Sequence, residues 1–62
     1  MTDLFPITIS EEIAELEREL GMRRHVYPRL VGEGKMPQAK ADRQLALMAS
    51  AIESLHRLRG LE

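Results

Sequence analysis

Two stretches of helical periodicity, joined by a short turn with glycines, constrain the fold of this chain more than any other feature. In the first stretch, apolar residues recur at spacings of 3, 4 and 7, which is typical of an amphipathic helix with one apolar stripe. The members of this stripe are Ile9, Ile13, Leu16, Leu20, Tyr27 and Leu30. The turn sequence GEGK at residues 32–35 predicts a reversal, because glycine adopts the positive φ angles that helix ends need. The sequence therefore predicts an all-α fold, an antiparallel helical hairpin.

The first helix is predicted over residues 10–31. Ser10 is a good N-cap, and Thr8 with Glu11 three residues later offers a competing capping box. Near the other end, Pro28 lacks the backbone N–H that a helix interior requires. We expect a kink or short break at Pro28, and the alternative is a helix that ends there and restarts with Pro28 in a first turn.

The second helix is predicted over residues 37–59, after a turn at 32–36, with Pro37 in its first turn and Gly60 as its cap. Its main apolar stripe is Ala41, Leu45, Met48, Ile52 and Leu55, and a second stripe beside it is Leu47, Ala51 and Leu58. Together the stripes cover about half of the helix circumference, which is more than one partner helix can bury. We therefore predict a homo-oligomer, in the simplest case a dimer forming a four-helix bundle. Its predicted interface is Leu45, Leu47, Met48, Ala51, Ile52, Leu55 and Leu58.

The length of the chain also favours assembly. A chain of 62 residues buries only about 60% of its unfolded surface, and without cysteine it forms neither disulfides nor thiolate zinc sites. Oligomerisation remains as the usual source of extra stability. His25 and His56 lack the spacing of a helical metal pair, so we predict no metal and no cofactor.

Residues 1–9 precede the predicted hairpin and include the apolar run LFPITI. This run alternates as a strand does, and we expect an extended arm that lies along a neighbouring bundle surface. The N-terminus has neither the basic start nor the apolar run of a secretory signal, and no stretch is apolar enough to span a membrane. With the absence of cysteine, these features predict a cytoplasmic location.

Charge is unevenly distributed along the chain. Residues 1–20 carry six acidic side chains and one arginine, a net charge of −5, whereas residues 21–43 have a net charge of +4 and residues 44–62 are neutral. Because residues 21–43 form the turn end of the hairpin, we predict a basic turn end. Guanidinium and ammonium groups gathered there are candidates for binding the phosphates of RNA, DNA or a nucleotide. The candidate residues are Arg23, Arg24, Tyr27, Arg29, Lys35, Lys40 and Arg43.

A purely structural interpretation of these residues stands beside the functional one. Arg23 interrupts the apolar stripe, and it can pair with Glu19 four residues earlier, either on the surface or within an oligomer seam. Tyr27 is expected in the core with its hydroxyl hydrogen-bonded, and Asp42 is a candidate acceptor. Stacking of Tyr27 on a nucleic-acid base is the alternative.

A motif of several parts lies within residues 17–52. It reads R-R-x-V-Y-P-R, then a turn containing G-K-M, then K-A-D-R, and it comprises Arg23, Arg24, Val26, Tyr27, Pro28, Arg29, Gly34, Lys35, Met36, Lys40, Ala41, Asp42 and Arg43. This motif resembles that of a group of short proteins encoded in phages and prophages of proteobacteria. The resemblance implies a phage or prophage origin and a bacterial host, without a particular activity. Leu30 stands where such sequences often have an aromatic residue, and Pro37 where they have a capping Thr or Ser.

The residue pattern predicts a binding protein rather than an enzyme. The glutamates of the first helix spread around it, and neither histidine lies in a pattern that pairs a nucleophile with a base, so we predict no catalytic residues. The first hypothesis is a protein–protein interaction module that engages a host or phage protein. The second is an anion binder for nucleic acid or a nucleotide.

Overall fold

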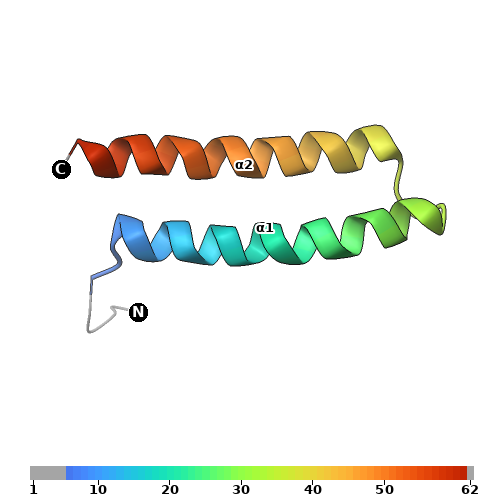
Figure 1. The fold of residues 1–62 in the computed structure, drawn as a ribbon, viewed down its shortest axis with the longest axis horizontal. Helices are drawn as coiled ribbons and strands as arrows, with labels where there is room; N and C mark the ends of the chain where they lie inside the picture. Colours follow the sequence, from blue (N-terminus) through green and yellow to red (C-terminus); the bar gives the residue numbers. More distant parts are fainter. Residues whose placement is uncertain (1–5, 62) are drawn as a thin grey trace.

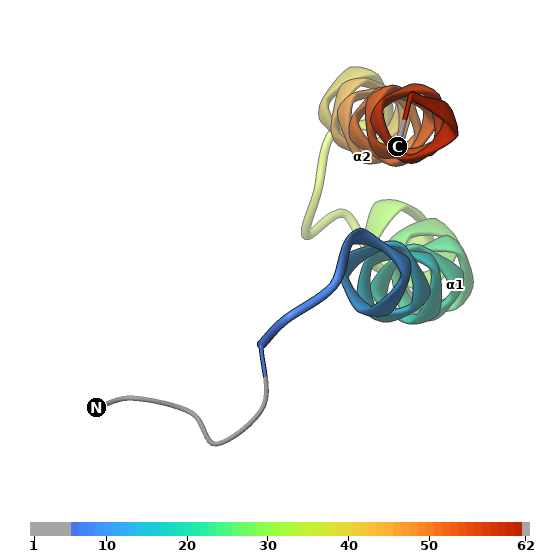
Figure 2. The same cartoon turned by 90° about the vertical axis from the view of Figure 1, so that its left-hand side faces the viewer.

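The chain folds into two antiparallel helices connected by a short turn. The computed structural model describes residues 6–61, in which α1 comprises Ile9–Gly32 and α2 comprises Gln38–Gly60 (Figure 1). Seen end-on, the two helices lie side by side, with residues 6–8 leading away from them (Figure 2). Every regular element within residues 6–61 is helical, which confirms the predicted all-α hairpin.

The first helix begins at Ile9, with Thr8 rather than Ser10 as its N-cap. The Thr8 hydroxyl oxygen accepts a hydrogen bond from the backbone N–H of Glu11 at 3.1 Å, and the hydroxyl donates to the Glu11 carboxylate at 3.1 Å. This earlier start brings Ile9 into the helix, where it packs against the core. Of the predicted arm, residues 6–8 have no regular structure and are exposed, whereas residues 1–5 lie outside the described part.

Pro28 lies inside α1, so the helix neither breaks nor restarts there. The missing N–H of Pro28 leaves the carbonyl of Arg24 without its usual helical partner. Both Arg24 and Pro28 are exposed, so water can satisfy this carbonyl. Tyr27 and Leu30 on either side are half-buried, and their packing favours continuation of the helix past Pro28.

The turn between the helices is a Schellman motif built around Gly34. The N–H of Lys35 donates to the carbonyl of Leu30 at 2.8 Å, and the N–H of Gly34 donates to that of Val31 at 3.0 Å. Gly34 has a φ of 74°, the left-handed conformation that glycine adopts without steric cost. Gly32, the other glycine predicted to supply a positive φ, instead ends α1 as an ordinary helical residue.

The second helix is bounded by residues that do not cap it with side chains. Pro37 is its N-cap rather than its first helical residue, and no side chain bonds to the free N–H groups of the first turn. At the other end, Gly60 is still helical and Leu61 is the C-cap, with its N–H donating to the carbonyl of Leu58 at 3.1 Å. Because packing against α1 covers one side of this helix, its formation does not depend on a strong N-cap.

The core lies along the seam between the helices. Ile13 and Leu20 of α1 and Ala41 and Ile52 of α2 are buried. Ile13, Leu20 and Ile52 form one cluster, and the partly buried side chains packed around it are Ile9, Leu16, Leu45, Met48, Ala49 and Leu55. This seam matches the apolar stripe predicted for the first helix and the main apolar stripe predicted for the second.

Candidate functional site

Two apolar stripes run along α2, and only one is covered by α1. The inner stripe, defined as Ala41, Leu45, Met48, Ile52 and Leu55, forms the seam with α1. The outer stripe, defined as Leu47, Ala51 and Leu58, is exposed, with 53% of Leu47 and 50% of Leu58 accessible. Four residues of the predicted oligomer interface, Leu45, Met48, Ile52 and Leu55, therefore pack within the chain. The other three form the outer stripe.

The outer stripe lies on one side of the hairpin, opposite a polar side. On the polar side, Arg59 donates to the Ser10 hydroxyl oxygen at 3.3 Å, and His56 Nε2 lies 3.9 Å from the Glu17 carboxylate. His56 directly follows an inner-stripe residue. Leu47, in contrast, directly precedes an inner-stripe residue. Because successive helical residues are about 100° apart, side chains that precede the inner stripe and side chains that follow it lie on opposite sides of the hairpin. We call this second side of the hairpin the stripe side.

The same rule places α1 residues on the stripe side. Glu12, Glu19 and Val26 each directly precede a residue of the α1 seam, whereas Glu17 directly follows one. On α2, Gln44, Ala51 and Ser54 likewise precede seam residues. The resulting series Gln44, Leu47, Ala51, Ser54, Leu58 and Leu61 has alternating spacings of 3 and 4, the pattern of a coiled-coil seam.

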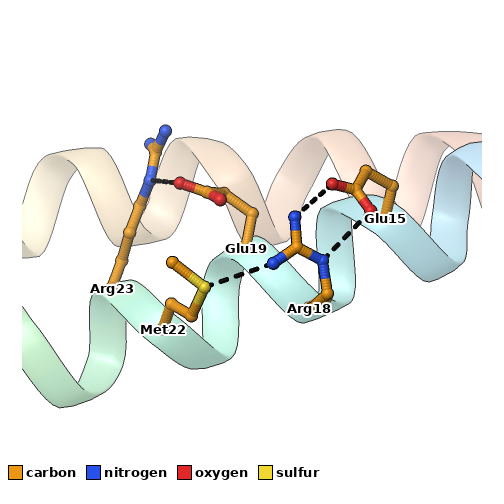
Figure 3. Close-up of polar contacts among 5 residues, drawn as sticks. All are labelled: Glu15, Arg18, Glu19, Met22 and Arg23. Carbon is orange, nitrogen blue, oxygen red and sulfur yellow. Dashed lines mark hydrogen bonds and ion pairs between the residues drawn. The ribbon is translucent and has the colours of Figure 1, made fainter.

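An ion pair stands on the stripe side of α1. Arg23 Nε donates to the Glu19 carboxylate at 3.1 Å, and the two side chains are 35% and 33% exposed (Figure 3). The four-residue spacing of Glu19 and Arg23 predicts this ion pair. The pair explains how a charged residue is accommodated within the apolar stripe. The alkyl part of Arg23 can cover the seam while its charge stays paired at the edge.

A second ion pair lies one turn earlier. The Arg18 guanidinium binds the Glu15 carboxylate and also contacts the Met22 sulfur at 3.3 Å (Figure 3). The hydrogen bond from Arg18, reinforced by its charge, holds the pKa of Glu15 below its ordinary value. The same contact raises the pKa of Arg18. Both side chains are well exposed, so this pair shapes the local charge more than the stability of the fold.

Tyr27 is half-buried, and its hydroxyl joins the two helices. The hydroxyl donates to the Gln44 side-chain carbonyl at 2.9 Å, so the predicted acceptor Asp42 is wrong. Asp42 follows Ala41 and faces away from Tyr27, where it accepts a hydrogen bond from the Gln38 amide at 2.9 Å. Gln44 directly precedes Leu45 and faces Tyr27. Sequence spacing contains no signal for this choice, because it depends on which side of the seam each residue takes.

The predicted anion-binding residues share the turn half of the molecule but not one surface. Arg23 is paired with Glu19, and Lys35 lies 3.8 Å from Glu33. Arg24 borders a shallow groove with Glu17, Gly21 and Ala49 on the polar side. Within residues 6–61, no carboxylate forms an ion pair with Arg24, Arg29, Lys40 or Arg43.

The contacts between Ser10 and Arg59 and between Glu17 and His56 were not anticipated from the sequence. They join residues at opposite ends of the chain, and they depend on the offset between the helices. His25 is exposed, and His56 Nδ1 lies 3.0 Å from the Arg59 guanidinium. No cluster of three or more His, Cys, Asp or Glu side chains suited to a metal ion occurs within residues 6–61.

Neither helix among the described residues is long and apolar enough to cross a membrane. No protein-family model, no curated protein and no solved structure matches the chain.

Proposed function

We propose that this chain is a small accessory protein that works by binding other proteins, first of all a second copy of itself. The outer stripe of α2 is the surface for self-association, and a dimer of hairpins forms a four-helix bundle. The bundle surface or the N-terminal arm then engages a host or phage protein in the bacterial cytoplasm. The resemblance of the motif to that of short phage and prophage proteins supports the proposed origin, and the outer stripe supports the proposed mode of action.

The observation that carries this proposal is the alignment of exposed leucines. Single exposed apolar side chains are common on protein surfaces and need no explanation. Leu47 and Leu58, however, are half-exposed on one face, and the small residues Ala51 and Ser54 lie between them. Small residues flanked by leucines let a second helix approach closely, and full burial of a leucine contributes about 1.5–3 kcal/mol.

Sedimentation velocity of two matched variants tests this proposal. Leu47→Gln with Leu58→Gln removes the apolar part of the outer stripe, and Met22→Gln changes an equally exposed apolar residue on the outside of α1, 50% accessible. We expect the unmodified protein and Met22→Gln to sediment as dimers, with twice the 7.1 kDa mass of the chain. The double variant should sediment as a monomer. A double variant that remains dimeric would contradict the proposed surface.

The second candidate function is binding of a phosphate-bearing ligand at the turn half. It is supported by Arg24, Arg29, Lys40 and Arg43, which have no ion-pair partner within residues 6–61. Phosphate binding weakens steeply as salt rises, whereas an apolar interface does not. Titration of a fluorescent single-stranded RNA at low and moderate salt, with unmodified protein and Arg24→Ala, separates the two functions. Saturable, salt-sensitive binding lost in Arg24→Ala would favour the anion binder.

A further inference from the structure

The stripe side has an acidic half and a basic half. Toward the open end of the hairpin it carries or borders Glu12 and Glu15, of which Glu15 is paired with Arg18, and toward the turn end Lys40 and Arg43. Glu19 and Arg23 lie between them, near the middle of α1. The division also holds for α1 as a whole, since residues 9–20 have a net charge of −4 and residues 21–32 a net charge of +3. A partner that covers this side meets opposite charges at its two ends.

A second copy can cover the stripe side with two-fold symmetry in two ways. In one, the symmetry axis runs along the helices, so both turns lie at the same end and α1 of each copy covers α2 of the other. In the other, the axis runs across the helices, so the turns lie at opposite ends and each helix covers its own counterpart. Both arrangements bury the outer stripe, so apolar contacts alone do not choose between them.

We propose that the second copy docks with its turn at the opposite end, placing α1 antiparallel to the other α1 and α2 antiparallel to the other α2. This inference rests on the self-association proposed above and adds its orientation. The acidic half of each stripe side then faces the basic half of the other. Same-end docking instead gathers Glu12 and Glu15 of both copies at one end and Lys40 and Arg43 of both copies at the other, and like charges brought together oppose association.

The ion pair between Glu19 and Arg23 supports the same orientation. These residues flank Gly21 near the middle of α1, and their side chains are only one-third exposed before any partner binds. A covered charge needs a partner to offset the loss of water. Antiparallel α1 helices centred near Gly21 bring Glu19 of one copy to Arg23 of the other, so every charge at this point keeps an opposite neighbour.

Charge reversal at the turn end distinguishes the two orientations. Lys40→Glu with Arg43→Glu makes the turn half of the stripe side acidic, and Lys40→Glu places an acidic residue in the first turn of α2, which has none. A negative charge there favours the helix, so the variant hairpin still folds. We expect self-association to weaken by about tenfold or more in the opposite-end dimer, because the introduced glutamates lie at the same end of the bundle as Glu12 and Glu15 of the other copy. Tighter association would contradict the proposal, since the change relieves the repulsion of same-end docking.

The matched control restores complementarity within the same chain. Adding Glu12→Lys and Glu15→Lys to the Lys40→Glu, Arg43→Glu variant exchanges the acidic and basic halves of the stripe side. The opposite-end dimer should then regain most of its affinity, measured by sedimentation equilibrium at low salt. Failure of this exchange to restore affinity would count against charge as the determinant of orientation.

A distance measurement between two turns decides the orientation directly. The chain has no cysteine, so Lys35→Cys gives one nitroxide label per copy in the exposed turn. Opposite-end docking separates the two turns by about the length of α1, which has 24 residues that rise ~1.5 Å each. It therefore predicts a label separation of about 35 Å or more in pulsed electron paramagnetic resonance. Same-end docking predicts a separation below about 20 Å, since packed helix axes are ~10 Å apart. The short distance would overturn the orientation alone, whereas a monomeric mass without dipolar signal would overturn the self-association itself.

Discussion

The inner and outer stripes of α2 have similar chemistry and similar spacing, but their burial differs sharply. Ile52 of the inner stripe is 7% exposed, whereas Leu58 of the outer stripe is 50% exposed. The difference comes from α1, which covers one side of α2 and leaves the neighbouring side open. Apolar periodicity therefore identifies surfaces that are suited to burial. Which partner buries each surface depends on how many helices the chain supplies.

Truncation within the inner stripe should have the largest effect on the fold. Ile52→Ala removes a buried side chain from the core cluster with Ile13 and Leu20, and we expect a loss of about 2–5 kcal/mol in the free energy of unfolding. Because the hairpin is small, this loss should unfold much of the population. Urea denaturation followed by circular dichroism measures it. A loss below about 1 kcal/mol would show that the seam with α1 is loosely packed and that the two stripes are alike.

The two glycines at the turn end of α1 should change the stability in opposite directions when each is replaced by alanine. Gly34→Ala places a side chain at a φ of 74° and should cost about 1–2 kcal/mol. Gly32→Ala is the matched control, because Gly32 is helical with no atom within 4 Å of an added Cβ, and it should stabilise α1 by about 0.5–1 kcal/mol. Thermal unfolding of both variants tests this contrast. Equal effects would mean that the turn does not need the left-handed conformation.

The hydrogen bond between Tyr27 and Gln44 joins α1 to α2 at the edge of the seam. Tyr27→Phe removes the donor and should lower the free energy of unfolding by about 0.5–1.5 kcal/mol. Combining it with Gln44→Leu in a double-mutant cycle isolates the contact, because both variants keep the size of the side chain. A coupling energy near zero would indicate that water replaces the bond without loss.

Truncation within the outer stripe should leave the isolated hairpin nearly unchanged. Leu58→Ala removes exposed contacts only, and we expect a change within about 0.5 kcal/mol at protein concentrations where the monomer prevails. At concentrations where the dimer prevails, the variant should be clearly less stable than the unmodified protein. If the effect of Leu58→Ala does not depend on concentration, the two stripes differ only in exposure and not in partner.

The smallest expected effect concerns the exposed pair of Glu15 and Arg18. The pKa of Glu15 is lowered in the folded chain, so the pair contributes stability above the ordinary carboxyl pKa of 4.5 and loses it as the pH falls below that value. Glu15→Gln should therefore lower the stability slightly near neutral pH and leave it unchanged at acidic pH, where the pair is already lost, so that the pH dependence of unfolding becomes flatter. Unfolding curves from pH 3 to 7 measure the difference. An unchanged acid profile in the variant would show that the pair does not form in solution.

Local signals in the sequence predicted much of the fold. The helical periods located both helices, and the first apolar stripe of each became the seam, with Ile13, Leu20 and Ile52 at its centre. The spacing of Glu19 and Arg23 predicted their ion pair. These features depend on residues within a few turns of one another, which sequence spacing describes well.

Features that depend on the relative placement of the helices could not be predicted. The acceptor for Tyr27 is Gln44 rather than Asp42 because only Gln44 lies on the side of α2 that faces Tyr27. The contact of Ser10 with Arg59 depends on the offset between the two helices along their axes. The continuation of α1 through Pro28 reflects packing that outweighs a local preference. The candidate anion-binding residues lie in the turn half of the molecule, but Arg23 and Arg24 are near the middle of α1 and the directions of the side chains around the two helices separate them.

Native mass spectrometry of the unmodified protein, at low and moderate salt, tests the central claim most directly. It reads the number of subunits and any co-purified mass in one experiment. The outer stripe as a surface for a second copy predicts a bare dimer of twice the 7.1 kDa chain mass at both salt concentrations. A bare monomer would contradict that claim. An added mass matching a nucleotide or oligonucleotide would favour binding of a phosphate-bearing ligand by the cations of the turn half.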